Sequence, residues 1–300
     1  MTFVLRILLC LVLVLVMGLG ADLGLAAKKK KAKRSAAPDD AMTVVIMRSA
    51  FKKCEPNCPM WIFADGRITS GTPGRFRKVL KQVGDRKLPV LLRSPGGDVN
   101  AAMDIGRLIM AKKLDTVVAD ARFAKCGPRE KSCEFAKIKA PVYPGYSDMS
   151  RSYCNSACTL ILAAGAKRIS APNASVGLHQ IQTTWYRDRQ RILETYRVVK
   201  GKKKVVSRKV VSSKRTTWTS TKLPKGFRNK LVTYFKAAGI NQQILDYMDK
   251  APPGRLYFAN PAELVALRLV NDTSKVSNYV GDDICGRSPP AGNCGPASAQ

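Results

Sequence analysis

Short apolar segments alternate with amphipathic helical patterns between residues 42 and 119. Four segments rich in β-branched and other apolar residues are bounded by polar, Gly or Pro positions, which is typical of buried strands. They read MTVVIMRS (42–49), MWIFADGRI (60–68), RKLPVLLRS (86–94) and DTVVA (115–119). Helical patterns follow Pro73 and, after the SPGG sequence, Gly97. Alternating strands and helices predict an α/β fold with a mostly parallel sheet.

The second half of the chain has a less regular pattern. Residues 121–152 are rich in Gly, Pro and charge and are expected to be irregular. The stretch CNSACTLILAAGAKRI (154–169) has the composition of a buried helix, and SVGLHQ (175–180) is typical of a strand after a turn. The remaining expected elements are a helix–turn–helix at 229–252, a helix at 261–270 and a loose tail at 284–300.

The N-terminal residues 1–26 are typical of a secretory signal peptide. One early charge, Arg6, precedes an apolar run that is too short to span a bilayer comfortably, and small residues follow it. Cleavage is expected near Ala26, with Ala21 as an alternative. The basic sequence KKKKAKR lies at the start of the linker 27–42, and positive charge there resists translocation. The alternative to a cleaved signal peptide is therefore an uncleaved inner-membrane anchor. The expected location is periplasmic or secreted.

The charge balance is far outside ordinary globular usage. The chain has 52 Lys and Arg against 21 Asp and Glu, a formal net charge of +31. Much of this excess lies in a basic insert at 187–230, where Asp188 and Glu194 are the only acids. The insert is interpreted either as a solvated loop or as a surface for anions. For an exported chain, an anionic envelope polymer or lipid headgroups fit better than nucleic acid.

Cysteine usage also indicates export. The chain has nine cysteines, of which Cys10 lies in the leader. The other eight form local pairs: Cys54 with Cys58, Cys126 with Cys133, Cys154 with Cys158, and Cys285 with Cys294. We expect disulfides rather than zinc, because the spacings are CxxxC or longer and no further histidine could complete a metal site. Only the pairing of Cys285 with Cys294, as a loop in the tail, is expected specifically.

A serine, the only histidine and a glycine pair form the candidate chemistry. Ser156 lies between two cysteines and His179 ends the strand at 175–180. A serine hydroxyl needs a base within hydrogen-bonding distance to act as a nucleophile, and His179 is the only possible imidazole. The amide of Ala157 and that of Gly96 or Gly97 are candidates for an oxyanion hole. Each residue alone also has a plain structural interpretation, as a cap, a structural histidine or a turn.

The order of these pieces resembles the Clp protease proteolytic subunit and its relatives in the ClpP/crotonase superfamily. The resemblance covers roughly residues 43–275, without the basic insert, within a domain expected at 43–283. In that family a nucleophilic serine precedes an LAAG-like segment and then a histidine before glutamine, which here are Ser156 and His179. The resemblance implies a fold of repeated β-β-α units, peptide or protein substrates, no cofactor, and a homo-oligomer of unknown order.

The third catalytic residue departs from the family pattern. Gly254, Arg255 and Leu256 stand where the resemblance places an aspartate. Asp249 or the amide oxygen of Asn260 is an alternative partner for the imidazole, or catalysis rests on two residues.

Three functions therefore remain open. One is an exported serine peptidase that works without ATP, because the sequence has no GxxxxGK[ST] loop. Another is a catalytically weakened scaffold that binds anionic polymer or lipid through the basic insert. A crotonase-type enzyme is the third, and it would require access to coenzyme A.

Overall fold

The computed structural model describes residues 40–130, 133–134, 142–150 and 152–296. The described residues belong to one compact unit, which spans residues 38–300. The expected signal peptide at 1–26 and nearly all of the basic linker lie outside the described residues. No helix within the described ranges is long and apolar enough to cross a bilayer.

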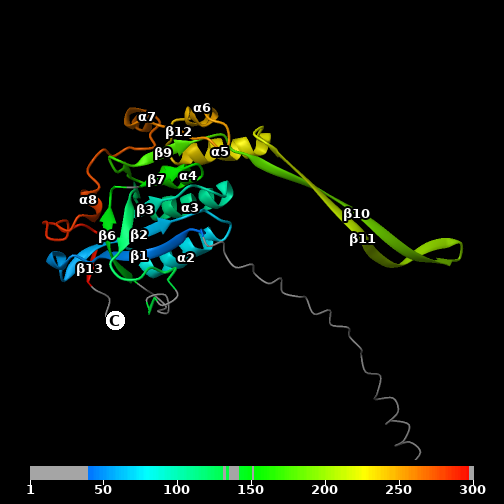
Figure 1. Ribbon diagram of the computed structural model, residues 1–300, viewed down its shortest axis with the longest axis horizontal. Helices are drawn as coiled ribbons and strands as arrows, with labels where there is room; N and C mark the ends of the chain where they lie inside the picture. Colours follow the sequence, from blue (N-terminus) through cyan, green and yellow to red (C-terminus); the bar gives the residue numbers. More distant parts are fainter. Residues whose placement is uncertain (1–39, 131–132, 135–141, 151, 297–300) are drawn as a thin grey trace, which may run out of the picture. The chain divides into compact units, whose positions relative to one another are not determined.

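A largely parallel sheet forms the centre of the structure (Figure 1). Strands β2 (Asn57–Asp65), β3 (Val90–Arg93), β4 (Thr116–Val118) and β8 (Arg168–Ser170) pair in this order, each parallel to the next. Strand β1 (Thr43–Ser49) pairs antiparallel with β2. The four strands expected between residues 42 and 119 are therefore present, in an α/β fold with a mostly parallel sheet.

Two segments expected to be irregular or loose contribute strands to this sheet. Strands β5 (Asp120–Phe123) and β6 (Val142–Asp148) form an antiparallel pair, and β6 lies parallel to β1. Strand β13 (Cys294–Pro296) pairs with β2, so the tail is not loose up to residue 296. Both expectations were wrong because backbone pairing with distant strands overrides a local composition rich in Gly and Pro.

Helices α2 and α3 begin close to their expected positions. Helix α2 (Thr72–Val83) has Pro73 in its first turn and buries an apolar stripe of Phe76, Val79, Leu80 and Val83. Helix α3 (Val99–Lys112) is capped by Asp98, whose carboxylate accepts a hydrogen bond from the amide of Ala101. Both helices contribute to one core cluster with side chains from one face of the sheet. The short 3-10 helix η1 (Lys52–Cys54) connects β1 and β2.

A smaller sheet contains the segment around Ser156. Strand β9 (Ser175–Leu178) lies between β7 (Tyr153–Asn155) and β12 (Tyr257–Phe258). Helix α4 (Cys158–Ala163) follows β7 after a turn and is fully buried. The buried helix expected at 154–169 is thus only six residues long. The expected length was too great because residues at the start of this segment, which have a helical composition, pair with β9 instead.

The basic insert forms a long antiparallel hairpin followed by a helix. Strands β10 (Thr183–Val199) and β11 (Lys202–Ser220) pair only with each other, and almost every residue in them is exposed. The part of the expected insert after residue 224 belongs to helix α5 (Lys225–Ala237). Most of the insert is therefore not a loop, because its two strands form a ladder of cross-strand pairs.

Short helices complete the C-terminal part. Helix α6 (Ile244–Asp249) follows α5 after a turn, as expected. Helix α7 (Pro261–Ala266) is shorter than its expected range, and α8 (Ser277–Val280) packs on the opposite face of the central sheet. All four local cysteine pairs lie at disulfide distance, including Cys285 with Cys294.

Candidate functional site

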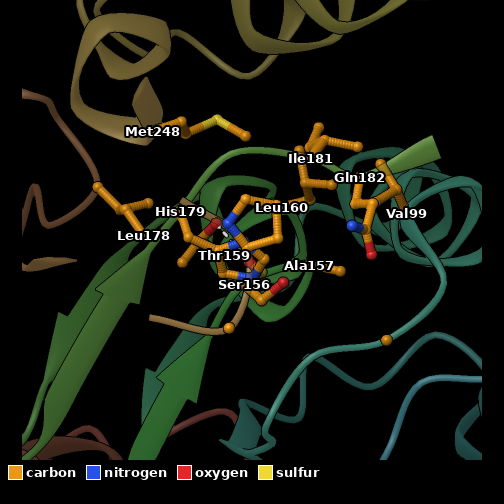
Figure 2. Close-up of a pocket in the computed structure, with 13 residues that line it drawn as sticks. Val99, Ser156, Ala157, Thr159, Leu160, Leu178, His179, Ile181, Gln182 and Met248 are labelled. Carbon is orange, nitrogen blue, oxygen red and sulfur yellow. Dashed lines mark hydrogen bonds between the residues drawn. The ribbon is translucent and has the colours of Figure 1, made fainter. Parts of the chain in front are cut away.

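A pocket of about 230 Å³ brings together most of the candidate residues (Figure 2). Ser156, Ala157, His179 and Gly97 all line it. They come from the β7–α4 turn, the end of β9 and the loop between β3 and α3. His179 is the one ionisable side chain in the lining. Residues far apart in the sequence therefore meet at one concave site, as a catalytic constellation requires.

Ser156 occupies a sharp turn between a strand and a helix. Its φ of 56° lies in the left-handed region, which residues with a Cβ atom adopt at a cost. The amide of Ser156 donates to the carbonyl of Gly177 in β9 at 2.7 Å, and its carbonyl accepts from Thr159. This turn differs from the helix start that the sequence suggests. In α/β-hydrolases a strained strand–turn–helix geometry exposes the nucleophile.

A disulfide brackets the serine. Cys154 in β7 and Cys158 at the start of α4 are fully buried and bonded to each other. The bridge joins the strand to the helix across the turn that holds Ser156. Because an oxidised sulfur cannot attack a carbonyl, neither cysteine can act as a thiol nucleophile in this state.

The two glycines of SPGG differ in the availability of their amides. The amide of Gly96 donates to the hydroxyl of Ser94 at 3.1 Å. The amides of Gly97 and Ala157 donate no hydrogen bond within the described part of the chain. Gly97 has a φ of 137°, and a Cβ atom there would lie 2.1 Å from the carbonyl oxygen of Ile68. Only glycine fits at position 97, and Gly97 with Ala157 is the pair free to bind an oxyanion.

The imidazole of His179 is half-buried and held on one side. Its Nδ1 lies 2.6 Å from the carbonyl oxygen of Gln180. Since a carbonyl only accepts, Nδ1 carries the proton in the neutral ring, and Nε2 keeps a free lone pair. No hydrogen bond joins Ser156 Oγ to this ring among the described residues. Catalytic hydrogen bonds are often long in free enzymes and shorten when substrate binds.

Neither expected partner, the carboxylate of Asp249 or the amide of Asn260, forms a hydrogen bond with the ring in the described part of the chain. Asp249 is exposed at the end of α6 and does not line the pocket. The side-chain oxygen of Asn260 accepts from the amide of Glu263 and caps α7. The partner of the ring is the carbonyl of Gln180, which sequence reasoning missed because backbone atoms leave no residue signature.

Apolar side chains form most of the rest of the pocket wall, which also contains one threonine and one glutamine. Val99, Leu160, Leu178, Ile181 and Met248 line it, from four different elements and the loop after β9. Apart from their apolar character, no sequence signal marked these residues, since their meeting depends on the tertiary fold. The arrangement provides a small apolar cavity beside a hydroxyl, an imidazole and two free amides. Within the described ranges, no group of His, Cys, Asp and Glu side chains could hold a metal ion.

Comparisons with known proteins give structural matches only. No protein-family model and no curated protein matches the sequence. A membrane-bound stomatin-specific protease is 14% identical, with 73% of this chain and 80% of that chain covered and a TM-score of 0.37. ClpP1 from Listeria monocytogenes is 13% identical (71% and 90% covered, TM-score 0.35). The ClpP catalytic domain from Plasmodium falciparum is 14% identical (70% and 82% covered, TM-score 0.36).

These solved structures are proteases of the kind that the sequence resembles. At TM-scores below 0.5 the likeness carries no inference about residues or activity. The function is therefore derived from the pocket itself.

Proposed function

We propose that the protein is an exported serine hydrolase that cleaves peptide bonds through an acyl-enzyme, with Ser156 as nucleophile and His179 as general base. The observation that carries the proposal is the pocket shared by these two side chains and the unoccupied amides of Gly97 and Ala157. Four disulfide pairs fit an oxidising compartment. The reaction is expected to proceed without ATP.

The chemistry follows from the free atoms of the pocket. Nε2 of His179 takes the proton of Ser156 Oγ as this oxygen forms a bond to the carbonyl carbon of the substrate. The resulting oxyanion accepts hydrogen bonds from the amides of Gly97 and Ala157. His179 then gives the proton to the amine that leaves, and water releases the acyl group by the same steps. Loss of one oxyanion donor typically costs about 10²–10³ in rate.

In the proposed enzyme, the carbonyl of Gln180 performs part of the role that the carboxylate has in a Ser-His-Asp triad. By accepting from Nδ1 it selects the tautomer in which Nε2 is the base. A neutral carbonyl stabilises the imidazolium less than a carboxylate does, because it carries only a partial charge. The proposed enzyme should therefore be slower than one with a complete triad, while keeping the same reaction.

The apolar wall predicts the substrate preference. Leu160, Ile181 and Met248 offer no charged partner, so an apolar side chain next to the scissile bond would replace water in the pocket. A charged side chain there would lose hydration without compensation. We expect peptides with a medium-sized apolar residue at this position to be cleaved fastest.

A fluorophosphonate probe tests the nucleophile directly. The purified full-length protein is labelled with its disulfides intact. The modified residue is then mapped by mass spectrometry. We expect the label on Ser156, none in Ser156→Ala, and labelling slowed by about 10²–10⁴ in His179→Asn. The exposed hairpin residue Ser213 provides the control, since Ser213→Ala should label like the unmodified chain.

Folded protein that leaves Ser156 unlabelled would overturn the proposal and leave the scaffold as the alternative. Circular dichroism of each variant separates this result from misfolding. Addition of ATP and Mg²⁺ should leave the labelling and peptide cleavage rates unchanged.

A further inference from the structure

The two faces of the β10–β11 hairpin carry different kinds of charge. Side chains of successive residues in a strand point to opposite faces, and directly paired residues share a face. The register pairs Trp185 with Trp218 and Tyr186 with Thr217. At two irregularities the register of β11 shifts by one residue, which leaves Val211 and Val206 without a paired residue. Every paired position of the hairpin can therefore be assigned to one of two faces.

One face, termed the Arg–Lys face, contains only cationic charges. Its charged members are arginines from β10 and lysines from β11: Arg187, Arg189, Arg191, Arg197, Lys202, Lys204, Lys209 and Lys214. No acidic side chain lies on it. Trp185 and Trp218 are at its base, where the guanidinium of Arg187 lies 5.8 Å from the ring of Trp218.

The opposite face, termed the paired face, is internally neutralised. Arg215 forms an ion pair with Asp188, and Arg208 with Glu194, both at 2.7 Å. Lys203 lies over the ring of Tyr196. Exposed apolar side chains fill the spaces between these groups: Ile192, Val198, Val205 and Val210. Both acids of the hairpin thus lie on the paired face, and the free positive charge is concentrated on the other.

We propose that the Arg–Lys face binds a flexible linear polyanion with a phosphate in each repeat. Arg187, Arg189 and Arg191 occupy every second residue of β10, a step of about 7 Å, and the eight cations are spread along about 40 Å of the face. This produces a narrow line of charge rather than a broad patch. Arginine forks recognise phosphate oxygens in pairs, and the lysines of the neighbouring strand add point charges along the same line.

A flat anionic bilayer fits this hairpin less well than a polymer does. The two strands wind around each other, as two-stranded ribbons do, so the line of cations also winds around the ribbon (Figure 1). A flexible chain can follow such a path, whereas a planar surface contacts only part of it. In addition, four of the six exposed aliphatic side chains at paired positions lie on the face opposite the free cations, and only Leu193 and Val199 lie among the cations. Inserting the larger set into lipid would turn the Arg–Lys face away from the headgroups.

This binding activity is separate from the proposed hydrolase chemistry. None of the eight cations lines the pocket around Ser156. The inference would therefore stand if the serine proved inert, and it would fail without affecting the serine.

Two variants with equal loss of charge test the inference. The first, Arg187→Gln with Arg189→Gln and Arg191→Gln, removes three cations from the Arg–Lys face. The second, Lys203→Gln with Arg208→Gln and Arg215→Gln, removes three from the paired face and serves as the matched control. Binding of the full chain to inorganic polyphosphate is measured by fluorescence anisotropy over a range of salt concentrations.

The salt dependence distinguishes contacts from general attraction. Each neutralised phosphate contributes about 0.7 to the slope of log K against log salt for a single-stranded polyanion. We expect the first variant to lower this slope by about 2 and the affinity at least about tenfold, with much smaller changes in the control. A third variant with lysine at Arg187, Arg189 and Arg191 keeps the charges and should keep the slope.

Three results would overturn the inference. Equal losses in both Gln variants would show that net charge alone acts. Unchanged binding in the first variant would place the contacts elsewhere. Tighter binding to phosphatidylglycerol vesicles than to polyphosphate, lost with Ile192→Ser and Val210→Ser, would identify a membrane as the partner. Far-UV circular dichroism and thermal unfolding confirm that each variant is folded.

Discussion

Replacing Ser156 with glycine should stabilise the fold while it abolishes the proposed activity. Ser156 has a φ of 56°, a conformation that costs about 1–2 kcal/mol for a residue with a Cβ atom. Glycine adopts it without steric cost. Within the described residues the hydroxyl makes no hydrogen bond, so its removal alone should change the free energy of unfolding little.

The magnitude follows from a comparison with alanine at the same position. Ser156→Ala keeps the strained backbone, whereas Ser156→Gly relieves it. Glycine also adds freedom to the unfolded chain, which offsets about 0.5–1 kcal/mol of the gain. The glycine variant should therefore be more stable than the alanine variant by about 0.5–1 kcal/mol, or about 2 °C in Tm for a domain of this size.

Thermal unfolding without reductant, followed by circular dichroism, measures this difference. Lys113 is a matched control because it ends α3 with a φ of 51° and lies outside the pocket. Lys113→Gly should raise Tm by a similar amount and leave labelling of Ser156 unchanged. A glycine variant at position 156 that melts below the alanine variant would refute strain at this turn.

Two further predictions concern a carboxylate and a disulfide. Hydrogen bonds from Ser274 and Tyr279 lower the pKa of Asp272 to about 2. The ionised group therefore stabilises the fold fully above its ordinary pKa, and about 2 kcal/mol is lost as the pH falls from about 5 to 2. Urea unfolding should show that the free energy of unfolding of Asp272→Asn falls correspondingly less over that pH range. If the stability of the variant and of the unmodified protein fell in parallel with pH, this prediction would be wrong. Replacing Cys154 and Cys158 with alanine should cost about 2 kcal/mol of stability and slow fluorophosphonate labelling by freeing the turn. A double variant of the tail disulfide should lose stability without slowing the label, and equal slowing in both would argue against a positioning role.

Several features of the protein follow from its sequence alone. Helix α2 and helix α3 form where local signals agree, since Pro73 and Asp98 mark their starts and apolar stripes follow at helical spacing. The four strands expected between residues 42 and 119 have the short-range composition of buried strands. Ser156 and His179 stood out because the chain has no other histidine. Each of these inferences rests on interactions within a few residues or on chemistry that a single side chain carries.

Other features were decided only by tertiary contacts. Residues 153–155 form a strand because β9 supplies their partners, and Ser156 consequently lies in a turn rather than in a helix. Gly97 rather than Gly96 has the free amide, because Ser94 already accepts from Gly96. The ring of His179 is held by a neighbouring backbone carbonyl instead of Asp249. The division of the hairpin into a cationic and a neutralised face depends on its register. A backbone amide or carbonyl has no residue-specific signature, so its partner becomes known only when distant segments meet.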